Sequence, residues 1–179
     1  MRKANAVISA VVMVLFIIHG IMGSMTLIGL GHINFKALSW VMLFLICVHT
    51  VIGIILTAKA VIVWRKTGAG YFKENKLFWA RRISGFAIMM FIFFHVTAFS
   101  YMNYGVYRLK MFDGAKLITQ MLLLLSVAVH VITNVRPMLI AFGIKKLKPR
   151  TGDILLFLSV MLFVMAIGFI VYYIRWNVL

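Results

Sequence analysis

Four histidines lie inside long stretches of sequence that contain no charged residue. His19, His49, His95 and His130 occur one to a stretch, and His95 ends the segment RRISGFAIMMFIFFH. A neutral imidazole nitrogen can bind a transition metal, exchange a proton or form a hydrogen bond. Because a titratable ring is costly to bury away from water, four such rings indicate either polar pairing between helices or a bound metal centre.

The uncharged stretches are long enough to cross a membrane. They comprise residues 4–31, 37–58, 83–107, 117–135 and 154–174. Roughly 20 apolar residues span the hydrocarbon core of a bilayer, and the composition, 64% hydrophobic and 12% charged, is too apolar for an ordinary soluble domain. We therefore expect an all-α membrane bundle that occupies residues 1–179 as a single domain. Its five transmembrane helices are predicted over about 5–30, 38–64, 79–104, 115–142 and 153–175.

The basic residues are divided unequally between the two ends of such a bundle. If the N-terminus is cytoplasmic, 14 of the 19 Lys and Arg face the cytoplasm. The other five face outside: Lys36, Arg108, Lys110, Lys116 and Arg175. By the positive-inside rule, we expect a multi-pass protein of the cytoplasmic (inner) cell membrane, with its N-terminus inside and its C-terminus outside. The net charge of +16 then indicates attraction to anionic lipids rather than to nucleic acid.

Depth along the predicted helices separates two histidines from the other two. His19 follows Lys3 by 16 residues, and His95 follows Arg82 by 13. At a helical rise of about 1.5 Å per residue, both lie about 20–24 Å from the cytoplasmic edge. We call His19 and His95 the outer pair.

The remaining two histidines lie closer to the cytoplasm. His49 precedes Lys59 by 10 residues, and His130 precedes Arg136 by 6. These spacings place the two rings about 9–15 Å from the cytoplasmic edge. We call His49 and His130 the inner pair.

Two imidazoles at one depth are the ligand set of a low-spin haem iron. The two pairs therefore predict two haem b groups, one held by His19 and His95 and the other by His49 and His130. One alternative is that the rings only form hydrogen bonds between helices. Another is a transporter that handles a metal ion or protons, but the uncharged stretches offer no acid for a proton relay. A metal-ion site would also need several ligands at one depth.

Small and basic residues near the histidines are candidate haem contacts. They are Gly23, Gly53, Ser84, Gly85, Ser126, Arg82 and Arg136. The glycines and serines stand mostly at helical spacing from a histidine, where a small side chain would leave room for a porphyrin. The two arginines could pair with propionates of the inner haem. Helix packing and anchoring of the topology are the competing explanations.

Two segments carry a resemblance to a known family. Arg82-Ile83-Ser84-Gly85 is followed by His95 ten residues after the glycine, and HVITNVRPMLIAFGIKKLKPR contains a His-x-x-x-Asn step. Within a five-helix chain, these segments resemble the dihaem cytochrome b membrane anchor of succinate dehydrogenases and fumarate reductases. The resemblance implies that the first and third helices bind the distal haem through His19 and His95. It likewise implies that His49 and His130 bind the proximal haem.

The resemblance also implies partners. An iron–sulfur subunit and an FAD-containing flavoprotein would dock on the cytoplasmic face, and electrons would pass between them and a membrane quinone, expected to be menaquinone. Succinate or fumarate would react on the flavoprotein, so this chain alone would not be a complete enzyme. His32, Asn34 and Lys36 are the nearest polar candidates for a quinone site, with a solvated loop as the alternative. A ferric reductase or a hydrogenase-linked cytochrome remains the alternative haem protein.

Overall fold

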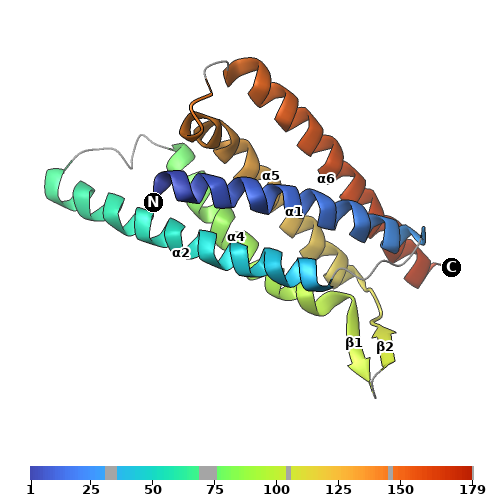
Figure 1. The fold of residues 1–179 in the computed structure, drawn as a ribbon. Helices are drawn as coiled ribbons and strands as arrows, with labels where there is room; N and C mark the ends of the chain where they lie inside the picture. Colours follow the sequence, from blue (N-terminus) through green and yellow to red (C-terminus); the bar gives the residue numbers. More distant parts are fainter. Residues whose placement is uncertain (31–35, 69–75, 104–105, 145–146, 179) are drawn as a thin grey trace.

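Five long helices dominate the fold of the chain. The computed structural model describes residues 1–30, 36–68, 76–103, 106–144 and 147–178. Within these residues the helices are α1 (Arg2–Ile28), α2 (Lys36–Thr67), α4 (Lys76–Ala98), α5 (Gly114–Ala141) and α6 (Leu147–Asn177), with two short strands, β1 (Ser100–Asn103) and β2 (Val106–Leu109). All five helices are long and apolar enough to cross a membrane, which suggests a multi-pass membrane protein. The two termini lie at opposite ends of the bundle (Figure 1).

The third predicted helix, 79–104, is wrong at its C-terminal end. Helix α4 ends at Ala98, and β1 and β2 then form an antiparallel hairpin that projects from the bundle (Figure 1). Residues 100–109 include three tyrosines and one valine, residue types that favour strands, so an uncharged stretch here does not make a longer helix. At the end of α4, Lys110 Nζ donates a hydrogen bond of 2.8 Å to the carbonyl of Thr97.

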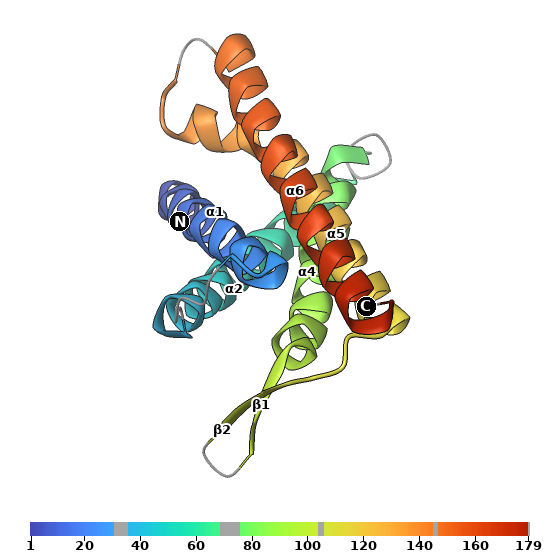
Figure 2. The ribbon, with the colours of Figure 1, turned by 90° about the vertical axis from the view of Figure 1, so that its right-hand side faces the viewer.

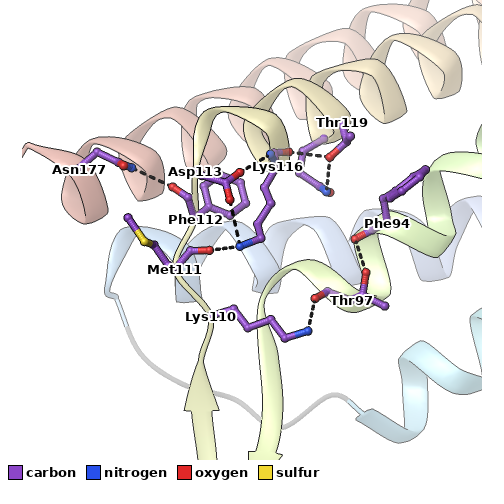
Figure 3. A network of polar contacts seen from close by, with 10 residues as sticks. Phe94, Thr97, Lys110, Met111, Phe112, Asp113, Lys116, Thr119 and Asn177 are labelled. Carbon is purple, nitrogen blue, oxygen red and sulfur yellow. Dashed lines mark hydrogen bonds and ion pairs between the residues drawn. The ribbon is translucent and has the colours of Figure 1, made fainter.

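Polar contacts join the start of α5 to the end of α6 (Figure 3). The Asp113 carboxylate accepts the backbone N–H of Lys116 at 2.9 Å, so Asp113 is the N-cap of α5. This hydrogen bond from the Lys116 backbone, together with the nearby Lys116 ammonium, lowers the pKa of Asp113. Asn177 Nδ2 donates to the carbonyl of Phe112 at 2.8 Å and thereby ties α6 to the residues before α5.

Helix α6 lies against both α1 and α5, while α1 packs on α2 and α4 packs on α5 (Figure 2). Small residues bring α1 and α6 together. A Cβ added to Gly168 would lie 3.4 Å from Ser24 Oγ, and one added to Gly20 would overlap the Met165 side chain. Such close approach is how membrane helices commonly associate. This packing holds the α1–α2 hairpin beside the α4–α5 hairpin.

A proline inside α5 is compensated by a neighbouring helix. Pro137 has no N–H, so the carbonyl of Thr133, four residues earlier, loses its helical partner. Arg81 Nε on α4 donates a hydrogen bond of 2.9 Å to that carbonyl. Arg81 therefore satisfies a backbone group that lipid could not, and it fixes α4 against α5.

Four tryptophans mark the two ends of the bundle. Trp64 lies in the last turn of α2 and Trp79 in the first turn of α4, at one end of the bundle. Trp40 and Trp176 lie near the opposite end. All four side chains are exposed in the isolated chain. Belts of tryptophan at both ends are typical of proteins whose helices cross a bilayer.

Candidate haem site

The four helical histidines form two close pairs, each of which joins one helical hairpin to the other. The rings of His19 on α1 and His95 on α4 have centroids 5.9 Å apart and an interplanar angle of 70°. The rings of His49 on α2 and His130 on α5 have centroids 6.1 Å apart and an interplanar angle of 87°. These are the outer and inner pairs that depth along the sequence predicts.

Serine hydroxyls fix the protonation of the inner pair. Ser9 Oγ lies 3.2 Å from His49 Nδ1, and Ser84 Oγ lies 3.2 Å from His130 Nδ1. Each hydroxyl donates its hydrogen to the backbone carbonyl four residues earlier, at 2.7 Å for Ser9 and 2.6 Å for Ser84. Because a hydroxyl has one hydrogen to donate, a serine that donates to its own helix is left to accept from the histidine. This arrangement favours the tautomer that carries its hydrogen on Nδ1 in both rings.

The outer pair has polar partners at the same ring position. His95 Nδ1 lies 2.7 Å from Gln120 Oε1, and His19 Nδ1 lies 3.1 Å from Ser39 Oγ. An amide oxygen only accepts hydrogen bonds, so Nδ1 of His95 carries the hydrogen. All four histidines thus use Nδ1 for a contact with the partner helix of their own hairpin. The Nε2 atom, with its lone pair, is the nitrogen left for a metal.

The spacing of the rings fits an iron held between them. A metal–imidazole bond is about 2 Å and each nitrogen lies about 1 Å from its ring centre, so two axial imidazoles have centres about 6 Å apart. Two aromatic rings in a simple edge-to-face contact have centroids roughly 4.5–7 Å apart, so the centroid distance alone does not distinguish a ring contact from a pair of iron ligands. The hydrogen-bonded Nδ1 atoms are what a metal site requires, because metal-bound histidines almost always donate their other N–H to a nearby acceptor, but histidines that only join helices make the same kind of contact.

The two hairpins repeat one arrangement of polar residues. Corresponding positions are Ser9 and Ser84, His19 and His95, Ser39 and Gln120, and His49 and His130. Each serine or glutamine precedes the histidine of its own helix by ten or eleven residues. The two levels are therefore about 15 Å apart along the helices. The two histidines are 35 residues apart in the second hairpin and 30 in the first, and the longer connection of the second hairpin, which includes β1 and β2, conceals the repeat in the sequence.

The Arg-x-Ser-Gly segment on α4 lies beside the inner pair of histidines. Ser84 contacts His130, and a Cβ added to Gly85 would lie 3.3 Å from His130 Cε1. Arg82 Nη1 donates to the carbonyl of Gly53 on α2 at 3.4 Å. The Arg82 side chain therefore connects α4 to α2, four residues beyond His49 on α2. Four of the predicted support residues thus lie together.

If the inner pair holds a haem, replacing Gly85 by alanine should weaken haem binding there. The new Cβ would lie 3.3 Å from His130 Cε1 and 3.5 Å from its Nδ1, so the ring would have to shift from its place beside His49. Changes to groups that orient a metal ligand typically lower affinity about 10–100-fold, and we expect the lower end of that range. Haem retained per chain during dilution in detergent measures the effect. Gly152→Ala is the matched control, since a Cβ there meets no atom within 4 Å; equal retention in both variants contradicts the prediction.

Three other residues that the sequence predicts to contact a haem make no described contact with a histidine. Ser126 Oγ donates to the carbonyl of Leu122 in its own helix at 2.7 Å. Arg136 is exposed near the end of α5. Gly23, one turn beyond His19, faces open space, because a Cβ there meets nothing within 4 Å. The predicted haem contacts of these three residues stay predictions.

The sequence prediction of a quinone site is not tested. His32 and Asn34 lie outside the described residues, and Lys36 is the exposed first residue of α2. The structure adds three histidine partners that the sequence analysis did not single out, Ser9, Ser39 and Gln120. Their signal in the sequence is a polar residue ten positions before the histidine of the same helix.

Comparisons with family models, curated proteins and solved structures find no match for this chain. The site is therefore interpreted from its own geometry. Among the residues that the structure describes, no group of three or more His, Cys, Asp or Glu could hold a bare metal ion. A haem differs from such an ion because its porphyrin supplies four of the six ligands and the protein needs only two.

Proposed function

We propose that this chain is a membrane cytochrome b that binds two haems and relays electrons through a succinate:quinone oxidoreductase complex. The observation that carries the proposal is the pairing of four histidines at two levels, with ring centroids 5.9 and 6.1 Å apart and every Nδ1 hydrogen-bonded. Two levels in one bundle suit two one-electron carriers in series. The haem at each level, when bound, would supply a ferric/ferrous couple.

The residues of the chain would act by orienting and by charge. Ser9, Ser84 and Gln120 contact Nδ1 of their histidines, which would leave Nε2 of each ring to ligate a haem iron. Arg82, held across α4 and α2 next to the inner pair, would bind a propionate of the inner haem. The apolar helices would exclude water from both levels.

In the proposed orientation the chain crosses the cytoplasmic (inner) cell membrane with its N-terminus in the cytoplasm. The basic connections would then form the face on which an iron–sulfur subunit and an FAD subunit dock, and the outer pair would serve a quinone. The rival class, a transporter that relays protons, is disfavoured because none of the three acids, Glu74, Asp113 and Asp153, belongs to an uncharged stretch of the sequence. Asp113 is the N-cap of α5 and Asp153 lies near the start of α6, whereas Glu74 is outside the described residues.

One purification tests the proposal. The tagged chain would be isolated from its native membranes, and its reduced-minus-oxidised visible spectrum, extracted haem b, flavin and iron would be quantified per chain. We expect two haem b per chain, together with covalently bound flavin and iron–sulfur clusters from the partner subunits.

Each departure from that result has a separate meaning. Two haems without flavin would keep the dihaem assignment but indicate another membrane haem protein, such as a ferric reductase or a hydrogenase-linked cytochrome. A folded, colourless chain would overturn the proposal and leave the histidines as polar contacts between helices.

A further inference from the structure

Gln120 differs from the other three histidine partners. It supplies an amide oxygen where the others supply a hydroxyl, and its contact is the shortest, 2.7 Å against 3.1–3.2 Å. Its side chain is also fully buried, at 0% exposure. Such a residue in a membrane helix needs a reason to be kept, because an unpaired amide is costly in an apolar interior.

The surroundings hold this contact rigidly. The His95 ring also packs edge-on against Phe99, with centroids 5.5 Å apart. Phe99 in turn stacks on the fully buried Phe112 at 5.4 Å. The His95 ring is therefore fixed between an amide and an aromatic cluster. A hydrogen bond in such a water-poor setting is stronger than one exposed to solvent.

We infer that Gln120 is a positioning residue that lowers the reduction potential of the outer haem. A strong acceptor on Nδ1–H makes the imidazole a more basic ligand, and a more basic ligand favours ferric over ferrous iron. His95 has the strongest acceptor of the four histidines. This inference rests on the proposed function, since it requires haem at the outer pair.

The test compares two substitutions in a chain that retains only the outer haem. In a His49→Ala background, the haem midpoint potential would be measured by redox titration of the visible spectrum. Gln120→Leu removes the acceptor while keeping an apolar side chain, and we expect the potential to rise by the equivalent of a three- to tenfold change in the reduction equilibrium. Tenfold corresponds to about 59 mV for one electron. Gln120→Glu retains an acceptor and should leave the potential at or below that of the unsubstituted chain.

The opposite directions separate a specific effect from general damage. Disturbed packing would move both variants in the same direction, whereas loss of the acceptor moves only the leucine variant upward. If Gln120→Leu does not fold, the glutamate variant still decides, because a raised potential there overturns the inference. An unchanged potential in Gln120→Leu also overturns it.

A matched control uses the inner pair. In a His95→Ala background, Ser84→Ala should shift the potential of the inner haem, whereas Gln120→Leu should not. A shift of the inner haem by Gln120→Leu contradicts a local effect. Failure of the proposed function looks different, since the unsubstituted chain would then bind no haem.

Discussion

Replacing His19 and His95 together by alanine should leave one haem b per chain, whereas replacing His19 and His49 together should leave none. The first change removes both ligands of one level and leaves the inner pair intact, with its centroids 6.1 Å apart. The second removes one ligand from each level, and a single imidazole no longer supplies the bis-histidine coordination of a low-spin haem. Haem extracted per chain, with the low-spin absorption bands, measures the outcome.

The complementary pair of double variants, one at the inner level and one across the two levels, serves as the control. His49 and His130 replaced together should again leave one haem, and His95 with His130 should leave none. Equal haem in the same-level and cross-level doubles would contradict the pairing even if the chain binds haem. Circular dichroism confirms that each double variant keeps its helices.

Arg81→Leu should destabilise the chain by about 1–3 kcal/mol, and Pro137→Ala should remove most of that cost. Arg81 Nε donates 2.9 Å to the Thr133 carbonyl, which Pro137 deprives of its helical partner. Without Arg81 that carbonyl is left unpaired in an apolar setting, which typically costs about 1–3 kcal/mol. An alanine at 137 supplies the missing N–H and makes the arginine redundant. Thermal unfolding in detergent, followed by haem absorbance and by helical circular dichroism, measures both variants.

The double-mutant cycle makes this prediction specific. Arg81→Leu should lower the free energy of unfolding less in a Pro137→Ala background than in the unsubstituted chain, which is the sign of a direct coupling. Additive effects would show that Arg81 stabilises the chain through another contact. Arg136→Leu is the control, because Arg136 is exposed on α5.

Much of the architecture follows from sequence alone, because its physical causes are local. Long uncharged runs determine the helices, since roughly 20 residues at 1.5 Å per residue cover a bilayer. The same rise sorts His19 and His95 to one depth and His49 and His130 to another, and the structure brings these pairs together. Haem ligation at those pairs stays a prediction.

Packing between helices decided what the sequence could not. The segment after Ala98 forms a hairpin rather than a longer helix, because strand preference and polar contacts at the helix end outweigh a merely uncharged stretch. Gln120, Ser39 and Ser9 became partners of histidines only when antiparallel helices set the register between them. Ser126 donates to the carbonyl of Leu122 in its own helix, and its place beside a haem stays a prediction. Spacing along one helix fixes depth and face, but which side chains meet across helices depends on a register that only the tertiary structure provides.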